Sequence, residues 1–320
     1  MKVTVVVPTY NRNASLRRTV EMVAQCDRDE IEALEIIVVD DGSSEPASHA
    51  TDSIVLPPST SLTCIRKSNG GAGAARNAGF RKASGDLILF LDDDMMPPRD
   101  LLQAHVRAHR EVPGAVICGS NQIFGPAPDS SLARYLKPIM GCVDAAHSPP
   151  YSKTTAASGN LSIMRADFAD RDRFYSDLPV GDDPELTIRL KGEGIPIMNA
   201  ARILVPTEMP TDIAGFVPRM QRQAYGLGSL VRVYRSGDLP PEVEKMLSAN
   251  GPWMRKDSMR RTLKKAALVV LSRFGIPRLL LGFVWLLEKA NAPDRVLHAG
   301  YQLLLDIAYF SGFRAGMAKK

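Results

Sequence analysis

Residues 86–98 read Asp-Leu-Ile-Leu-Phe-Leu-Asp-Asp-Asp-Met-Met-Pro-Pro. The apolar run Leu87–Leu91 is typical of a strand buried on both faces of a parallel sheet. Three aspartates follow it directly, and the carboxylates of Asp92 and Asp94 lie on the same side of an extended chain. Hard oxygen ligands of this kind suit Mg²⁺ or Mn²⁺. The alternative is a solvated acidic turn that follows a strand.

Strand-like and helix-like segments alternate through the first half of the chain. Apolar runs predict strands at 3–7, 34–39, 62–66 and 87–91, with another beginning at 116. Helices are expected after a cap at Asn11 or Asn13, over 70–83 and over 99–110. This order indicates an α/β protein with a mostly parallel sheet flanked by helices. Ligands bind beyond the carboxyl ends of such strands, where three polar clusters lie: Pro8-Thr9-Tyr10, Asp40-Asp41 and Asp92–Asp94.

The pattern changes after residue 119. We expect a long excursion over 124–150 and a strand over Thr154–Met164 that contains Gly159-Asn160. A helix over 181–193, capped by Asp182 or Asp183, a strand over 195–205 and a helix over 216–233 complete the set. The polar segment 236–258 marks a boundary, so we predict a first domain over 1–235 and a helical extension over 236–320.

The cysteines and the chain start suggest a cytoplasmic protein. Cys26, Cys64, Cys118 and Cys142 are scattered without metal-ligand spacing, which is typical of reduced thiols. No signal peptide precedes the first strand-like run.

The basic charge of the chain is concentrated in one segment. Residues 252–278 carry eight basic side chains and one acid, a net charge of +7, and the chain total is +5, so the remainder is 5 − 7 = −2. The apolar runs 266–271 and 279–287 are too short to span a bilayer. Residues 255–287 therefore predict a helix in the interface of an anionic membrane, at the inner face of the cell membrane. The alternative is a helical hairpin packed on the first domain or in a homodimer, and we expect no nucleic-acid partner.

Five motifs point to a known family. They are Val-Pro-Thr-Tyr-Asn-Arg (7–12), Val-Val-Asp-Asp-Gly-Ser (38–43), Gly-Ala-Gly-Ala-Ala-Arg-Asn-Ala-Gly (71–79), Leu-Asp-Asp-Asp (91–94) and Gly-Asp-Asp-Pro-Glu-Leu-Thr-Ile-Arg-Leu (181–190). In this order and spacing, residues 1–235 resemble an inverting family 2 glycosyltransferase of the GT-A fold. The resemblance implies a nucleotide-sugar donor, often a UDP-sugar, and a glycan or lipid-linked acceptor.

The resemblance also implies a role for individual residues. Pro8, Thr9 and Tyr10 resemble the loop that receives the nucleotide base, and Asp41 resembles the carboxylate that hydrogen-bonds the base. Arg76 resembles the arginine that closes over the nucleotide. Asp92 resembles the first aspartate of the family's Asp-x-Asp, near the ribose. The donor-binding candidates that remain are Arg12, Asp93, Gly159 and Asn160, although Asp93 should point away from its neighbours on an extended chain.

The same resemblance assigns the chemistry. Asp183 resembles the catalytic base, in an Asp-Asp pair where relatives more often have Glu-Asp. Asp94 resembles the metal-binding aspartate, so a Mg²⁺ or Mn²⁺ ion is implied. Many relatives complete the metal shell with a histidine after the last core strand, but here Glu208 stands in that stretch as a possible ligand, with water as the alternative. His105 and His109 are expected to be surface or helix residues and not ligands.

Two other functional classes compete with this interpretation. A nucleotidyltransferase also uses a metal-binding aspartate, but it has a Gly-rich loop with Arg and Lys where Pro8–Arg12 stands here. A non-catalytic nucleotide-sugar-binding protein could use the basic tail as an anchor, but the presence of Asp92, Asp94 and Asp183 argues against a degenerate site.

Overall fold

The structure is a computed structural model. It describes residues 1–124, 129–140, 142, 144–168, 175, 178, 180–208, 212–234, 240–241, 259–273 and 276–318. The chain forms two compact units. The first contains Met1–Gly125 and Lys137–Glu208, and the second contains Pro126–Leu136 and Met209–Lys320. The helix that ends at Tyr234 belongs to the second unit, whereas we expected a domain boundary at residue 235. That boundary stays a prediction.

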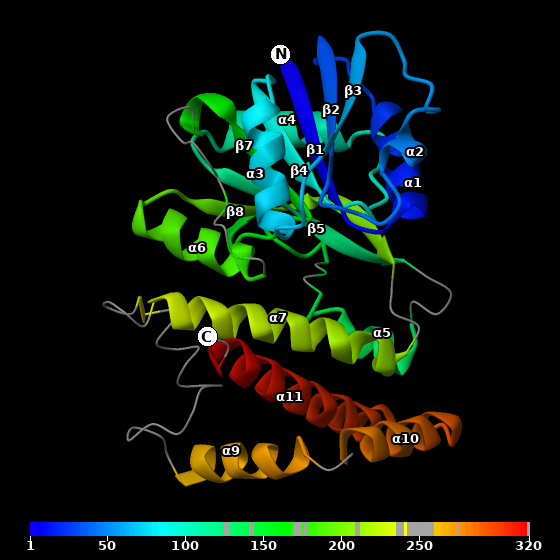
Figure 1. Ribbon diagram of the computed structural model, residues 1–320, viewed down its shortest axis with the longest axis vertical. Helices are drawn as coiled ribbons and strands as arrows, with labels where there is room; N and C mark the ends of the chain where they lie inside the picture. The colour runs from blue at the N-terminus through cyan, green and yellow to red at the C-terminus, as the bar shows by residue number, and fades with distance from the viewer. Residues whose placement is uncertain are drawn as a thin grey trace. The chain divides into compact units, whose positions relative to one another are not determined.

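The first unit is built on one sheet of eight strands (Figure 1). The strands are β1 (Lys2–Thr9), β2 (Ala33–Asp40), β3 (Thr60–Arg66), β4 (Leu87–Leu91), β5 (Val116–Phe124), β6 (Tyr151–Lys153), β7 (Asn160–Met164) and β8 (Ile197–Glu208). Their order is β3-β2-β1-β4-β7-β5-β8-β6. The pairs β1–β2, β1–β4, β2–β3 and β5–β8 are parallel, whereas β7 runs antiparallel to β4 and β5, and β6 to β8.

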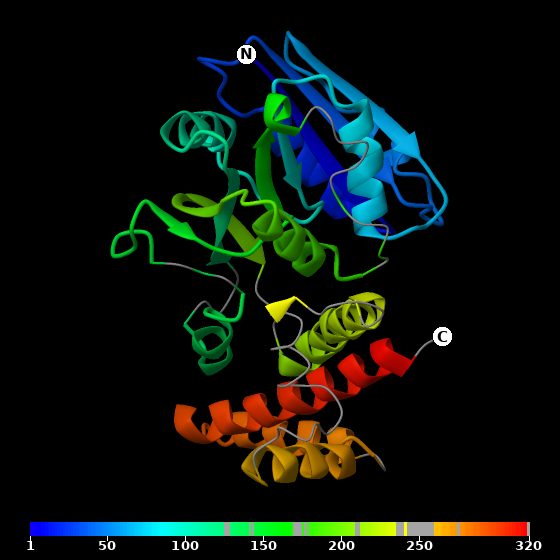
Figure 2. The same ribbon diagram turned by 90° about the vertical axis from the view of Figure 1, so that its left-hand side faces the viewer.

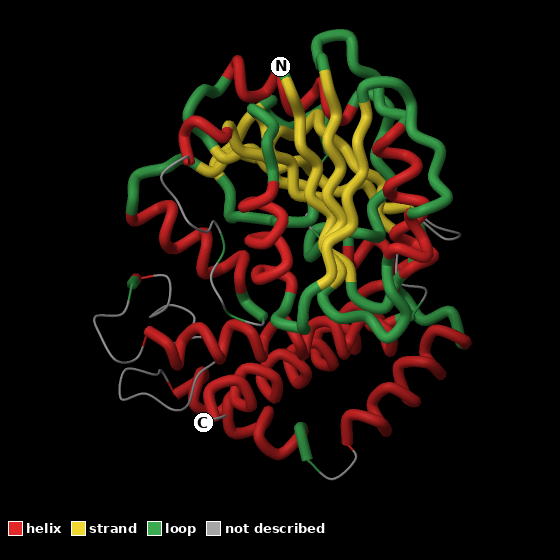
Figure 3. Tube along the Cα trace, turned by 45° about the horizontal axis from the view of Figure 1, so that its top comes forward, coloured by secondary structure: helices red, strands yellow, loops and turns green. Residues whose placement is uncertain are grey.

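Helices cover both faces of this sheet, as Figure 3 shows. They are α1 (Asn13–Ala24), the short α2 (Ser48–Thr51), α3 (Ala72–Lys82), α4 (Leu101–Glu111) and α6 (Asp182–Gly192), with a 3₁₀ turn at Arg165–Phe168. Val5 in β1 packs in one core with α1 and α4, and its neighbour Val6 packs in a second core with α3 and α6. Because successive strand residues face opposite sides, the apolar run buries both faces. The expected mostly parallel, helix-flanked α/β sheet is confirmed.

Three local predictions were wrong. Arg12 precedes α1 without a capping side chain, because Asn11 has a φ of +56° and its side chain accepts a hydrogen bond from the Ser44 N–H. The stretch expected as one strand, Thr154–Met164, contains only β7 and the turn before it. In α6, Gly181 (φ +95°) takes the capping position, so both aspartates lie inside the first turn.

The second unit is helical. It consists of α5 (Ser131–Leu136), α7 (Ile213–Tyr234), α9 (Met259–Leu271), α10 (Ile276–Lys289) and α11 (Asp294–Ala318). The sequence did not indicate α5, but a helical C-terminal extension was expected. Among the described residues, no single helix is long and apolar enough to cross a bilayer. Taken together, the consecutive segments Thr262–Leu271 and Ile276–Lys289 have the length and apolar composition of a membrane span, but the two segments are bent by 91° relative to each other.

Glycines allow α7 and α11 to pack closely against each other (Figure 2). A Cβ atom built on Gly228 of α7 would lie 2.1 Å from the backbone oxygen of Phe313 in α11. On α11, a Cβ built on Gly316 would lie 2.0 Å from the Tyr225 backbone oxygen. The backbones therefore approach more closely than any side chain at these positions would permit.

We expect Gly228→Ala to destabilise the protein by about 1–3 kcal/mol, because overpacking forces the two backbones apart. Gly282→Ala in α10 is the matched control, since a Cβ atom placed on Gly282 would have no neighbouring atom within 4 Å. Alanine favours a helix over glycine by up to about 1 kcal/mol, so the control should be neutral or stabilising. Urea unfolding measures both. Equal stabilities of the two variants would contradict the close packing.

Candidate active site

The three aspartates after β4 have different environments. Asp92 accepts a hydrogen bond from Nη2 of Arg76 (2.7 Å), and Asp94 accepts one from Nη1 of Arg12 (2.5 Å); both are partly exposed. Asp93 is buried and accepts from the Thr9 hydroxyl at 2.6 Å. Burial raises the pKa of Asp93 to about 6, although Thr9 and Arg12 oppose the shift. Asp92 and Asp94 can therefore meet a ligand, whereas Asp93 ties the turn to β1.

The end of β1 is linked to this turn. Pro8 and Thr9 are the last residues of the strand, and Tyr10 after it is half exposed. Arg12 also reaches Asp93, at 3.3 Å. From α1, the Thr19 hydroxyl lies 2.9 Å from the Asp93 carbonyl and 2.8 Å from that of Met95. The sequence-predicted residues of the first and fourth strand ends are thus brought together.

Asp41 is buried and holds the loop that leads into α3. One of its oxygens accepts from Nζ of Lys67 (2.6 Å), and its two oxygens also accept from the backbone N–H groups of Gly70 and Gly71. Lys67 was not among the predicted site residues. Its position directly after β3 was the available signal, because the strand ends of a parallel sheet lie along one edge.

Arg76 is the buried centre of the site. Its guanidinium donates to Asp92 and to Asp182, each at 2.7 Å, and lies 5.4 Å from the ring centroid of Tyr175. Burial opposes its charge, but Asp92 and Asp182 raise the pKa of the guanidinium above its ordinary value. Asp182 and Tyr175 were not among the predicted site residues.

Asp183 lies in the first turn of α6 and is half-buried. Its two carboxylate oxygens accept from the backbone N–H of Ser158, at 3.2 and 3.3 Å. Burial raises the pKa of Asp183 to about 7, the charge of Asp182 adds to the rise, and Arg76 opposes it. A carboxylate with such a pKa can exchange a proton near neutral pH.

Gly159 and Asn160 occupy different places. The Gly159 carbonyl accepts from the Asp92 N–H (3.1 Å), and a Cβ on Gly159 would lie only 2.8 Å from Oδ2 of Asp92. The Asn160 side chain is buried against His105 of α4, so it does not join the other candidates. His105 and His109 lie on a helix, as expected, but both are buried and neither is a surface residue.

Two carboxylates could hold a metal ion. Asp92 and Asp94 are accessible oxygen donors on one turn, and Mg²⁺ is commonly bound by one or two carboxylates with substrate phosphates and water. The donor set therefore fits the implied ion. Among the described residues, no group of three His, Cys, Asp or Glu side chains could do so alone. Glu208 ends β8, but its side chain lies outside what the structure describes.

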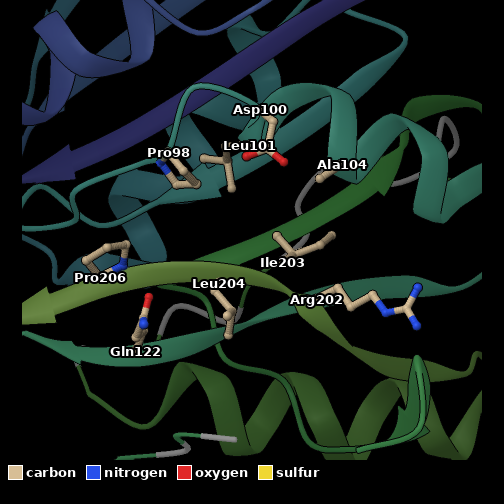
Figure 4. Close-up of a pocket in the computed structure, with 9 residues that line it drawn as sticks. All are labelled: Pro98, Asp100, Leu101, Ala104, Gln122, Arg202, Ile203, Leu204 and Pro206. Carbon is tan, nitrogen blue, oxygen red and sulfur yellow. The ribbon is translucent and has the colours of Figure 1, made fainter. Parts of the chain in front are cut away.

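A separate pocket of about 230 Å³ lies between the start of α4 and strands β5 and β8 (Figure 4). It is lined by Pro98, Asp100, Leu101, Ala104, Gln122, Arg202, Ile203, Leu204 and Pro206. None of the predicted site residues is in this lining.

Curated proteins of related sequence match part of this chain. The Bacillus subtilis (strain 168) protein named uncharacterized glycosyltransferase YfnE is 34% identical over 119 residues, covering 37% of this chain and 30% of the relative. The undecaprenyl-phosphate 4-deoxy-4-formamido-L-arabinose transferase of Serratia proteamaculans (strain 568) is 35% identical over 111 residues, 34% of each chain. The chain thus spans about a third of the length of these curated relatives.

A solved structure shares the fold over a longer range. The mannosyltransferase PcManGT from Pyrobaculum calidifontis, in complex with GDP-Man and Mn²⁺, superposes with a TM-score of 0.60 at 19% identity. The alignment covers 97% of this chain and 86% of that one. The sheet and its flanking helices agree with the expected GT-A fold, and the expected C-terminal helices are present.

The sequence model described as glycosyl transferase family 2 matches residues 4–171. Since this match covers more than half of the 320 residues, the chain belongs to glycosyl transferase family 2.

Proposed function

We propose that the protein transfers a sugar, with inversion, from a nucleoside-diphosphate donor to a hydroxyl group of a glycan or lipid-linked acceptor. One observation carries the proposal: Arg76 joins Asp92 to Asp182, beside Asp183 with its raised pKa. A candidate base thus stands next to a guanidinium suited to a diphosphate and next to Asp92, which could hold the diphosphate through a metal ion. Family membership supports the same class of reaction.

Each residue has a distinct task in this mechanism. Asp183, held by the Ser158 N–H, takes the proton of the acceptor hydroxyl as that oxygen attacks the anomeric carbon. With a single base and no enzyme nucleophile, one displacement inverts the anomeric configuration. Arg76 stabilises the charge that develops near Asp92. A Mg²⁺ or Mn²⁺ ion held by Asp94, with Asp92 beside it, would neutralise charge on the leaving diphosphate.

For the donor, we infer a UDP-sugar bound at the ends of β1 and β2. Pro8, Thr9 and Tyr10 would flank the base, and Asp41 would hydrogen-bond it. Arg12 and Asp94 form an accessible ion pair, which a bound metal and diphosphate would separate by supplying each with a new partner. Asp93 supports this loop through Thr9. Glu208 stays a prediction as a further metal ligand.

A lipid-linked acceptor would require the enzyme to work at a membrane. An exposed apolar face in the helical unit supports such membrane binding. Leu279, Phe283 and Leu286 are more than half exposed and recur along one face of α10. Arg273, which precedes α10, and Arg278 in its first turn are exposed, and Nζ of Lys289 lies 5.8 Å from the centroid of the Trp285 ring. We propose that this face, defined as Leu279, Phe283 and Leu286 of α10, binds the cytoplasmic surface of an anionic membrane. Arg255 and Lys256 of the predicted basic segment lie outside the described residues.

The direct test of the proposed function is nucleotide release from a panel of nucleotide sugars, with Mn²⁺ and with a chelator. We expect Asp183→Asn to lower kcat by about 10²–10⁴-fold, because an amide cannot act as the base. Donor-induced thermal stabilisation should persist in this variant. Glu193→Gln, an exposed change at the end of the same helix, is the control and should match wild type. Full turnover by Asp183→Asn would exclude Asp183 as the base.

The rate should depend on pH in a specific way. The deprotonated form of Asp183 is active, so kcat/KM should rise with pH through its raised pKa and fall off in acid well above the ordinary carboxyl range near 4. Asp182→Asn removes a neighbouring negative charge, which should move this acid limb to lower pH. The pH–rate profiles of both proteins measure the shift. A limb that stays in place, or moves to higher pH, would contradict the assignment.

Membrane binding can be measured by liposome flotation. The protein should float with anionic vesicles at low salt and less at 1 M salt, where the Debye length is about 3 Å. Replacing Leu279, Phe283 and Leu286 by serine should abolish flotation. Val296→Ser, an exposed apolar change on α11, is the control. Absence of flotation of wild type at low salt would remove the membrane proposal.

A further inference from the structure

Four buried polar side chains connect α4 to β7, and one of them, Asn160, follows directly after Ser158 and Gly159, which contact Asp183 and Asp92. His105 reaches Oγ of Ser162 through Nδ1 (2.7 Å) and Oδ1 of Asn160 through Nε2 (2.8 Å). His109, one helical turn later, reaches the same Ser162 hydroxyl at 2.8 Å. Each of the four residues is at most 5% exposed. Buried polar groups are costly unless they are paired, so a network of this kind requires a reason.

The directions of these hydrogen bonds follow from burial. Burial lowers the pKa of His105 to about 3 and that of His109 to about 4, against the effect of their hydrogen bonds, so both are neutral near pH 7. A neutral imidazole has one donor and one acceptor nitrogen. With Oδ1 of Asn160 as acceptor, His105 donates through Nε2 and accepts from Ser162 through Nδ1. Ser162 in turn accepts from His109. The result is one directional chain that ends at Asn160.

Asn160 is placed where this chain can control the site. It begins β7 and pairs with Leu91, the last residue of β4. The two residues before it contact the backbone of Asp92 and the carboxylate of Asp183: the Gly159 carbonyl accepts from the Asp92 N–H, and the Ser158 N–H donates to Asp183. The position of the turn Ser158–Asn160 is therefore coupled to the position of the Asp92 backbone and of the Asp183 carboxylate.

The opposite side of Asn160 is enclosed as well. A Cβ atom on Gly119 of β5 would lie 1.9 Å from Nδ2 of Asn160. The Asn160 side chain is thus fixed between β5 and α4, and it cannot turn toward a ligand without leaving both. Its contact with His105 replaces the ligand contact that the family resemblance implied.

We propose that His105 and Asn160 are positioning residues, which hold the turn Ser158–Asn160 so that Asp92 and Asp183 keep the spacing that the transfer needs. The kinetic consequence rests on the proposed function, whereas the structural consequence rests on the buried contacts. His109 is hydrogen-bonded to Ser162 and not to Asn160 in the described part of the chain, so it serves as a comparison within the same network.

The kinetic test compares His105→Phe with His109→Phe, which make the same change four residues apart on α4. His105→Phe should lower kcat by about 10–100-fold, because displacement of a reacting group by 1 Å can cost 10²-fold. His109→Phe should lower the melting temperature as much as His105→Phe does, but it should keep most of the wild-type kcat. His105→Gln, whose amide can still donate to Asn160, should recover part of the activity. Equal losses from both phenylalanine variants would show a purely structural network and overturn the proposal.

Hydrogen exchange followed by mass spectrometry supplies a readout that needs no turnover. In His105→Phe, peptides that contain residues 91–94 and 157–161 should exchange faster, whereas His109→Phe should leave them unchanged. A folded His105→Phe protein with unchanged exchange there would overturn the positioning role. If wild type turns over no nucleotide sugar, the proposed function fails, and the exchange result alone decides whether His105 positions the turn.

Discussion

A buried guanidinium is stable only with partners, and the site depends on how Arg76 meets this constraint. Removing one partner of a buried ion pair leaves an uncompensated charge and costs about 3–5 kcal/mol. Arg76 lies in α3, Asp92 directly follows β4, and Asp182 lies in α6. The two ion pairs of Arg76 therefore connect one strand of the sheet to two of the helices that cover it. The raised pKa of Asp183 also depends on this arrangement, because Asp182 and Arg76 act on it with opposite sign.

The remaining polar contacts extend from this centre along the edge of the sheet. Asp93 connects the turn after β4 to β1 through Thr9, and Asp41 connects β2 to the loop before α3. The partly exposed carboxylates of Asp92 and Asp94 thus lie next to buried carboxylates that hold the neighbouring loops. In this pattern the buried Asp93 keeps the turn after β4 in place through Thr9, as precise positioning of Asp92 and Asp94 requires.

The sequence predicted the sheet well because its strands are short apolar runs whose burial is visible in their composition. It also predicted that the polar clusters at 8–10, 40–41 and 92–94 share an edge, since parallel strands end together. Contacts between distant side chains carried no such signal. The contacts of Asp182 with Arg76 and of Asn160 with His105 depend on the packed structure. The α6 cap was misassigned for a local reason, because Gly181 adopts a positive φ and no side chain was needed.

The crowding between Gly159 and Asp92 has a consequence for how this protein can change over generations. A Cβ at position 159 would come within 2.8 Å of the Asp92 carboxylate, so every other amino acid there would displace a residue of the proposed donor site. The effect of a change at 159 therefore depends on which residue stands at 92. We therefore expect substitutions at positions 159 and 92 to have non-additive effects.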